Sequence, residues 1–168
     1  MEVAAVKLDR IDRRILRDLQ ARGRITNVEL AKRAGISPPP CLRRVRALEE
    51  TGCIIGYHAE VASESLGFGV TAFAHVGLHS QADTDLIAFE GLVATWPEVR
   101  ACHMLAGETD FLLKIVATDW DAYQRFLTTR LTAAPNVSVV KSALAIRTSK
   151  NLPGVPIGED ESDAIENR

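Results

Sequence analysis

Two short helices joined by a glycine are predicted by residues 26–46, which read TNVELAKRAGISPPPCLRRVR. Thr26 and Glu29 have the spacing of a capping box, in which each side chain accepts a hydrogen bond from the other residue's backbone N–H. Gly35 stands where the first helix must end and the chain must turn. This pattern is typical of a helix-turn-helix, which places its second helix in the major groove of DNA.

The second helix of the pair is expected to turn its apolar residues inward and its arginines outward. Ser37 can cap this helix, and Pro38 falls at its first position, where a missing N–H costs little. Leu42, Val45 and Leu48 recur at helical spacing and are expected to face the core. A third, amphipathic helix is predicted between Asp9 and Arg22 and would complete a trihelical core. We expect the DNA contacts to come from Thr26, Asn27, Ser37, Pro38, Pro39, Arg43, Arg44 and Arg46.

A basic helix alone could be an ordinary solvated surface, but the charge of this chain is unevenly distributed. Residues 1–56 contain twelve Lys or Arg and seven Asp or Glu, a net charge of +5, whereas residues 57–168 have a net charge of −7. A basic end on a chain of net charge −2 indicates a surface for a polyanion at that end. Double-stranded DNA is the partner that the motif and the charge favour together.

Length and composition limit the remaining possibilities. With 168 residues, 46% of them apolar, the chain can form two small domains with cores of their own. No apolar run is long enough to span a bilayer, and the first residues lack the apolar segment of a signal peptide, so a cytoplasmic protein is expected. The three cysteines are odd in number and have no CxxC spacing, which argues against a disulfide framework and a zinc site.

The C-terminal half predicts a different architecture. After Gly52 the chain becomes rich in β-forming residues over 53–61, as a wing or a connecting strand, and small residues up to Gly69 indicate a linker. Beyond it the elements follow in the order βαββαβ, the ferredoxin-like plan. The expected strands are 70–78, 99–106, 110–117 and 137–146, and the expected helices are 84–95 and 120–132. The expected fold class is therefore α+β.

This organisation predicts four segments: a DNA-binding domain at 1–56, a connecting strand and linker at 57–69, an αβ-sandwich domain at 70–148 and an acidic, mobile tail at 149–168. Two helices can cover only one face of the sheet. The other face carries apolar residues and needs a cover, for which a second copy of the chain is the simplest candidate.

Several motifs in order resemble the Lrp/AsnC family, the feast/famine transcription regulators of bacteria and archaea. The resemblance covers residues 8 to about 150 and rests on LDRID at 8–12, GRITNVELA at 23–31, LRRVRALE at 42–49, GCIIGY at 52–57 and GETDFLL at 107–113. It implies a winged helix-turn-helix, a sheet-mediated homodimer that assembles into an octamer or a similar ring, and an amino acid as effector.

Two departures from the family pattern have structural consequences. The usual Ser-Pro-x-Pro-Cys entry to the second helix has Pro39 in its variable position, and three successive prolines predict a distorted first turn. Glu108 stands where the family usually has Asp, and Phe111 where Tyr is common. The effector itself is therefore not fixed by the resemblance.

The effector site is expected around the turn between two central strands. Glu108 and Asp110 would meet the ammonium group of an amino acid and backbone N–H groups its carboxylate, although the turn could also be a plain hairpin. The expected effector-binding residues are His103, Met104, Leu105, Gly107, Glu108, Thr109 and Asp110. His75 and His79 would lie about 13 Å apart on one strand, too far to share a metal ion, so no metal site is expected.

Three functions remain open from the sequence. The first is a sequence-specific transcriptional regulator whose assembly or DNA affinity responds to a small effector, for which an amino acid is favoured. The second is an architectural DNA-binding protein without an effector. The third is a small dimeric ferredoxin-like enzyme, which is disfavoured because no nucleophile, oriented base or cofactor cradle accompanies the carboxylates at 108 and 110. We therefore expect no catalytic residues and no cofactor.

Overall fold

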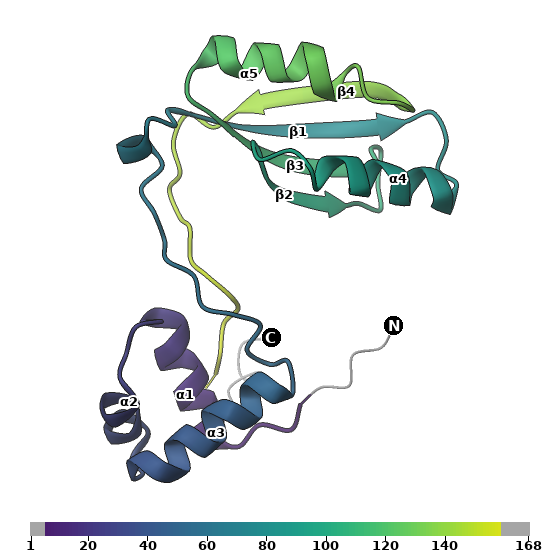
Figure 1. Ribbon diagram of the computed structural model, residues 1–168. Helices are drawn as coiled ribbons and strands as arrows, with labels where there is room; N and C mark the ends of the chain where they lie inside the picture. The colour runs from purple at the N-terminus through teal and green to yellow at the C-terminus, as the bar shows by residue number, and fades with distance from the viewer. Residues whose placement is uncertain (1–5, 159–168) are drawn as a thin grey trace. The chain divides into compact units, whose positions relative to one another are not determined.

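The computed structural model describes residues 6–158 and divides into two compact units (Figure 1). The first contains the chain up to residue 60 together with the segment that starts at Lys150, and the second contains residues 61–149. The division falls inside the linker predicted at 57–69. No helix among the described residues is long and apolar enough to span a membrane.

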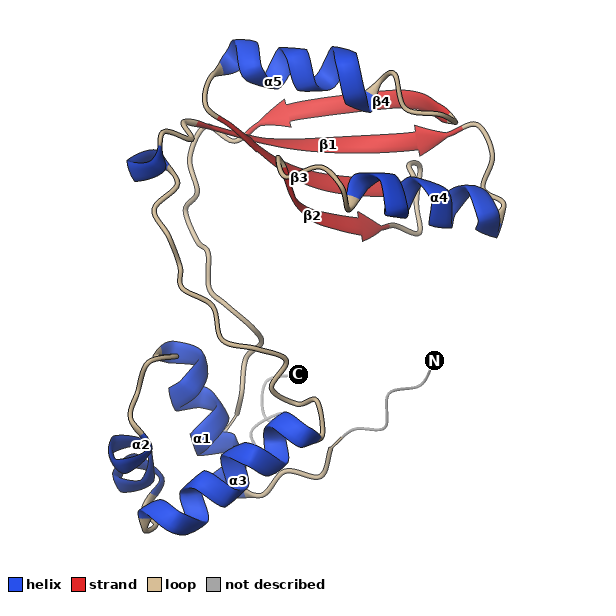
Figure 2. Ribbon diagram, viewed as in Figure 1, coloured by secondary structure: helices blue, strands red, loops and turns tan. Residues whose placement is uncertain are grey.

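The first unit is a bundle of three helices (Figure 2). They are α1 (Arg10–Ala21), α2 (Asn27–Ala34) and α3 (Pro38–Glu50). All three contribute to one core because their apolar residues recur at helical spacing. The buried core residues are Ile15, Leu30, Ala31, Ala34, Cys41 and Leu48. The trihelical arrangement predicted from the sequence is thus confirmed.

The capping interactions at the helix N-termini agree only in part with those expected from the sequence. Asp9 caps α1 in a complete capping box with Asp12, which the sequence analysis did not identify. The Thr26 hydroxyl accepts a hydrogen bond from the backbone N–H of Glu29 at 3.2 Å, as expected. The Glu29 carboxylate instead pairs with Arg33 one turn later, at 3.5 Å. Gly35 ends α2 with a φ of 75°, the left-handed conformation that favours glycine.

The three prolines do not distort α3, contrary to expectation. They occupy its first three positions, where backbone N–H groups have no partner within the helix, so the absence of these donors removes no helical hydrogen bond. They also explain why the expected cap by Ser37 is missing. A capping hydroxyl accepts from the second or third residue of the helix, and here these are Pro39 and Pro40, which have no N–H to donate.

The second unit is a four-stranded antiparallel sheet with two helices on one face (Figure 1). In chain order its elements are β1 (Val70–Leu78), α4 (Asp83–Val93), β2 (Val99–Met104), β3 (Phe111–Ala117), α5 (Trp120–Phe126) and β4 (Val137–Leu144). The strands are arranged in the order β2-β3-β1-β4. The predicted ferredoxin-like plan is therefore confirmed.

Two expected elements differ from the structure. The β-rich stretch 53–61 forms no strand, because the described part of the first unit offers no neighbouring strand to pair with. The helix expected at 120–132 changes after Phe126 into a π-helical turn, Leu127–Leu131. The hydroxyls of Thr128 and Thr129 donate there to backbone carbonyls of the preceding turn, which competes with regular helix hydrogen bonding.

The face of the sheet opposite the helices is open and partly apolar. Along β1 the even-numbered residues are buried against α4 and α5, so the odd-numbered residues point to the other side. Phe73 lies on this open face and is 38% exposed, and Val139 on β4 is 42% exposed. Leu112 on β3 lies between them and the edge strand β2. Apolar side chains gathered on one face indicate an interface.

We predict that a second copy of the chain covers this open face. Introducing a charge by Phe73→Glu should lower the sedimentation coefficient of the full chain at micromolar concentration, because an unpaired carboxylate would be buried in the interface. The matched control is Ile87→Glu on α4, which replaces an equally apolar and more exposed side chain elsewhere. A monomeric wild type, or equal behaviour of the two variants, would contradict the prediction.

Candidate DNA-binding face and ligand pocket

The outer face of α3 carries two of the three arginines expected to contact DNA. Pro39, Arg43, Arg46 and Glu50 follow one another at intervals of three or four residues and are all exposed. Side chains at this spacing lie on one face of a helix. Arg43 and Arg46 therefore extend into solvent from the same side of α3, where a duplex could approach.

The core face of α3 differs by one position from the expected one. Leu42 was expected in the core but is 40% exposed, whereas Cys41 is fully buried and Leu48 nearly so. Cys41, Val45 and Leu48 have the spacing of a single helical stripe, and Val45 packs against the core that the other two form. Cys41 is therefore a small core residue.

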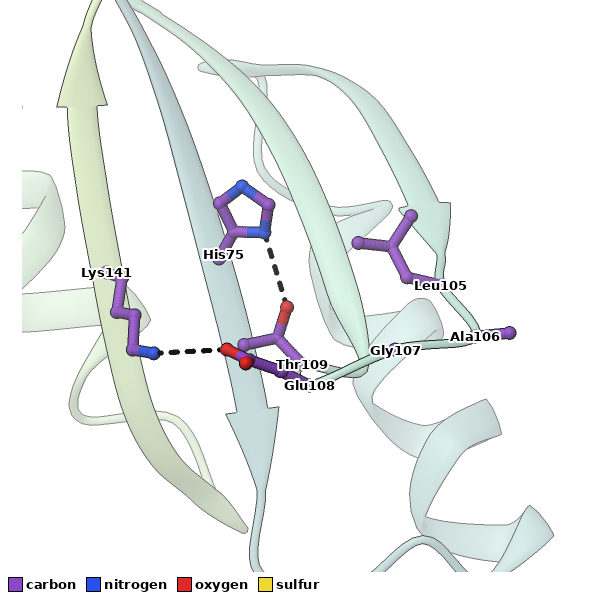
Figure 3. A pocket seen from close by; sticks show the side chains of 7 residues that line it. All are labelled: His75, Leu105, Ala106, Gly107, Glu108, Thr109 and Lys141. Atoms are coloured by element: carbon purple, nitrogen blue, oxygen red, sulfur yellow. Dashed lines mark hydrogen bonds and ion pairs between the residues drawn. The ribbon is translucent and has the colours of Figure 1, made fainter.

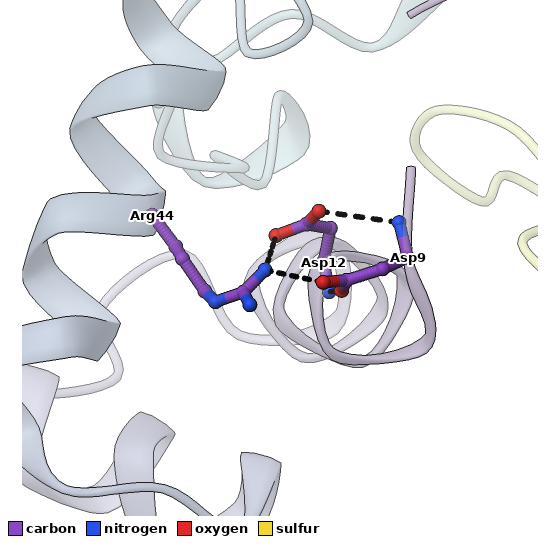
Figure 4. A network of polar contacts seen from close by, with 3 residues as sticks. All are labelled: Asp9, Asp12 and Arg44. Atoms are coloured by element: carbon purple, nitrogen blue, oxygen red, sulfur yellow. Dashed lines mark hydrogen bonds and ion pairs between the residues drawn. The ribbon is translucent and has the colours of Figure 1, made fainter. Parts of the chain in front are cut away.

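Arg44 points toward α1 instead of the exposed face (Figure 4). Its Nη1 donates to Asp9 Oδ2 and to Asp12 Oδ1, each at 2.7 Å. The backbone N–H of Asp12 and the Arg44 guanidinium both hold the pKa of Asp9 below its usual value. The hydrogen bonds to Asp12 and Asp9 raise the pKa of Arg44. Arg44 thus links the middle of α3 to the start of α1.

The remaining residues expected at the DNA interface lie where α2 and α3 begin. Asn27 Nδ2 donates to the carbonyl of Pro38 at 2.9 Å and so ties the start of α2 to the start of α3. The side-chain oxygen of Asn27 is buried and has no hydrogen-bond partner among the described residues. Thr26 and Ser37 are the N-terminal flanking residues of the two helices. Asn27 therefore links the starts of the two helices of the pair.

A pocket of about 370 Å³ lies beside the turn between β2 and β3 (Figure 3). Its lining residues are His75, Leu105, Ala106, Gly107, Glu108, Thr109 and Lys141. Two polar contacts bridge it: His75 Nδ1 lies 3.3 Å from the Thr109 hydroxyl, and Lys141 Nζ lies 3.8 Å from Glu108 Oε2. Thr109 is the one buried polar residue of the described chain.

The register of three strands brings the charged and polar side chains of the pocket together. His75 on β1 pairs with Lys141 on β4, and both lie on the open face of the sheet. On its other side His75 pairs with Leu112 of β3, which follows the turn that carries Glu108 and Thr109. The pocket therefore opens on the same face as the apolar residues described above.

Four of the seven expected effector-binding residues line the pocket, and three do not. Leu105, Gly107, Glu108 and Thr109 line it. His103 and Met104 are exposed on the edge strand β2 and do not line it. His75 and Lys141 line it but were not expected. They are neighbours because of the register between β1 and β4, which alternation along a single strand does not reveal.

Asp110 fixes the turn in place and does not line the pocket. Its Oδ2 accepts the backbone N–H of Leu78 at 2.7 Å, and its Oδ1 accepts a hydrogen bond from Gln81 Nε2 at 2.8 Å. The backbone N–H of Asp110 also donates to the carbonyl of Val76 at 2.9 Å. These bonds attach the beginning of β3 to the end of β1, so Asp110 holds the turn whose Glu108 and Thr109 face the pocket.

Comparison with known proteins agrees with the division of the chain into two units. Residues 8–55 match the family model of a winged helix-turn-helix DNA-binding domain, and residues 71–155 match that of the Lrp/AsnC ligand-binding domain. The chain is 52% identical to the leucine-responsive regulatory protein of Rhizobium meliloti, over 92% of this chain and 99% of that protein. It is 42% identical to the Bkd operon transcriptional regulator of Pseudomonas aeruginosa, over 84% of this chain and 93% of that protein.

Solved structures show the same relationship. A transcriptional regulator from Neisseria meningitidis in complex with L-Met superimposes with a TM-score of 0.85 and 38% identity, over 89% of this chain and 97% of that one. An AsnC family transcriptional regulator from Agrobacterium tumefaciens gives a TM-score of 0.83 at 34% identity over the same shares. With both domains matched and in this order, the chain belongs to the Lrp/AsnC family of DNA-binding transcriptional regulators.

Proposed function

We propose that Arg43 and Arg46 of α3 contact operator DNA and that a free amino acid, bound in the pocket at the β2–β3 turn, changes the DNA affinity or assembly of the protein. The observation that carries the effector half of this proposal is the charge pair of the pocket, Glu108 and Lys141. A regulator of this kind acts on DNA in the cytoplasm and performs no catalysis.

The pocket is chemically suited to an α-amino acid. The pocket offers one carboxylate, Glu108, and one ammonium group, Lys141, and these match the ammonium and carboxylate of such a ligand. Glu108 is 92% and Lys141 65% exposed, so their mutual ion pair at 3.8 Å contributes little and can be exchanged for bonds to a ligand. His75 and Thr109 add a second polar pair beside them.

The relatives narrow the choice of ligand to be tested. One similar structure contains L-Met, and several similar proteins are named leucine-responsive regulatory protein. Both amino acids combine the same charged groups with an unbranched or γ-branched apolar side chain, for which Leu105 and Ala106 offer the apolar part of the lining. L-leucine and L-methionine are therefore the ligands that we expect to bind.

Two other functions were considered from the sequence. An architectural DNA-binding protein would share the α3 face but would not need a pocket with a matched pair of charges. An enzyme is disfavoured by the relatives, which are named as transcriptional regulators. An effector-dependent regulator accounts for both units of the chain.

Alanine variants separate the arginines that are proposed to contact DNA from Arg44. Arg43→Ala and Arg46→Ala should each weaken operator binding by about 1–3 kcal/mol if the side chain contacts a base, with unfolding free energy unchanged. Arg44→Ala should instead lower the free energy of unfolding by about 1–2 kcal/mol, because Asp12, which is 16% exposed, would lose its cation. Urea denaturation and fluorescence anisotropy with an operator duplex measure the two quantities.

The contribution of Arg44 to the free energy of unfolding should depend on pH. Because the pKa of Asp9 is depressed in the folded protein, its contribution to stability is present above the unfolded-state value of about 4 and is lost as the pH falls further. The difference in stability between the wild type and Arg44→Ala should therefore shrink below about pH 4.

Unchanged operator affinity in both Arg43→Ala and Arg46→Ala would refute the assignment of α3 as the contacting helix.

Two substitutions test the pocket. Glu108→Gln and Lys141→Met should each weaken the binding of L-leucine or L-methionine about tenfold or more, since each removes a charge-assisted contact. Isothermal titration calorimetry measures the dissociation constants. Glu90→Gln on α4 is the control, because it removes an exposed carboxylate outside the pocket. Wild-type affinity in both pocket variants would place the effector elsewhere.

A further inference from the structure

The outer face of α3 is apolar where the helix begins and basic one turn later. Pro39 is exposed at the second position of the helix, and Leu42, three residues further on, is 40% exposed. Arg43 follows Pro39 by four residues, and Arg46 follows Leu42 by four. Since side chains three or four residues apart share a face of a helix, the two apolar side chains lie beside the two arginines.

The core of the first unit does not include Leu42. Among the described residues of α3, Cys41 and Leu48 are buried in this core and Val45 packs against it. Single exposed apolar residues are common on protein surfaces. Leu42, however, lies beside a second exposed apolar residue, Pro39, on the face that is proposed to contact DNA. Such a pair indicates contact with an apolar group of the partner.

The first turn of α3 has no backbone donors with which to hold a phosphate. Free N–H groups at the start of a helix commonly bind phosphate. Here the first three residues are prolines, which lack an N–H, and the N–H of Cys41 donates to the carbonyl of Ser37 at 3.3 Å. The beginning of α3 therefore presents the carbon atoms of Pro39 and Leu42, and positive charge starts only at Arg43.

The major groove offers one apolar group to such a surface, the C5-methyl group of thymine. In a helix-turn-helix the N-terminal residues of the second helix contact base edges, and this is where Pro39 and Leu42 lie. We propose that these two side chains contact thymine methyl groups and thereby select A·T pairs where the start of α3 meets the operator. This inference rests on the function proposed above, in which α3 contacts operator DNA.

The selection would come from the burial of apolar surface. Contact with a methyl group removes apolar surface of both partners from water, which favours thymine. Cytosine in the same place has no methyl group and presents an amino donor, for which the side chains of Pro39 and Leu42 have no acceptor. Arg43 and Arg46 lie one turn later, where they would meet phosphate or a neighbouring base. The apolar pair and the arginines thus have separate roles.

The test uses a duplex that the full chain selects from a random-sequence pool. Deoxyuridine replaces thymidine in this duplex at one position at a time, which removes the methyl group and keeps the hydrogen-bonding groups of the base. By fluorescence anisotropy, the affinity should fall severalfold at one or two positions in each half-site and stay unchanged at the others. If no position responds although the selected duplex binds, the proposed methyl contacts are refuted.

Two variants assign the methyl contacts to α3. Leu42→Gln keeps a good helix former, and Pro39→Ser restores a backbone N–H that can donate to the Ser37 hydroxyl, so both should fold as the wild type does. In each variant the ratio of thymidine to deoxyuridine affinity at a responsive position should fall toward one. Ile55→Gln is the matched control, because it removes an apolar side chain that is 95% exposed and lies outside α3. This control should keep the wild-type ratio.

The ratio and the overall affinity test different claims. If both α3 variants keep the wild-type ratio, or if the control loses it as well, the assignment of the methyl contacts to Pro39 and Leu42 is overturned. Weaker binding by Arg43→Ala and Arg46→Ala would then still support α3 as the helix that contacts DNA. Wild-type affinity in both arginine variants would instead refute the proposed function, and this inference with it.

Discussion

Every second residue of β1 is buried between the sheet and its two helices, and this alternation determines what the opposite face can do. Ala72, Ala74 and Val76 pack into the core, so Phe73 and His75 must point to the open side. A shift of one residue in register would exchange the two sets and expose the core. The same constraint that forms the hydrophobic core therefore positions a pocket residue and an apolar surface together on one face.

In the first unit the corresponding constraint is the contact of α3 with α1. Cys41 and Leu48 fix one side of α3 in the core, and Arg44 binds the carboxylates at the start of α1. With these contacts made, Arg43 and Arg46 have no position other than the solvent side. The positions of the three arginines along α3 thus direct Arg44 toward α1 and leave Arg43 and Arg46 exposed to solvent.

The helices, the strands and their order could be predicted from the sequence because they depend on local periodicity and turn chemistry. The neighbours of His75 and Lys141 could not be predicted from the sequence, because strand register is set by contacts between residues more than thirty positions apart. The contact of Arg44 with α1 could not be predicted either, because the sequence around Arg44 does not show that α1 lies beside it. The missing cap at Ser37 was predictable, since Pro39 and Pro40 have no N–H to donate.

The central claim is that amino-acid binding in one unit alters DNA binding by the other. The most direct measurement is the operator affinity of the full chain, by anisotropy, with and without saturating L-leucine or L-methionine. We predict a severalfold change in affinity with one of them, and an equal change in amino-acid affinity when DNA is bound first, because coupling free energies are reciprocal. An unchanged operator affinity with the pocket saturated would contradict the account and support an architectural role.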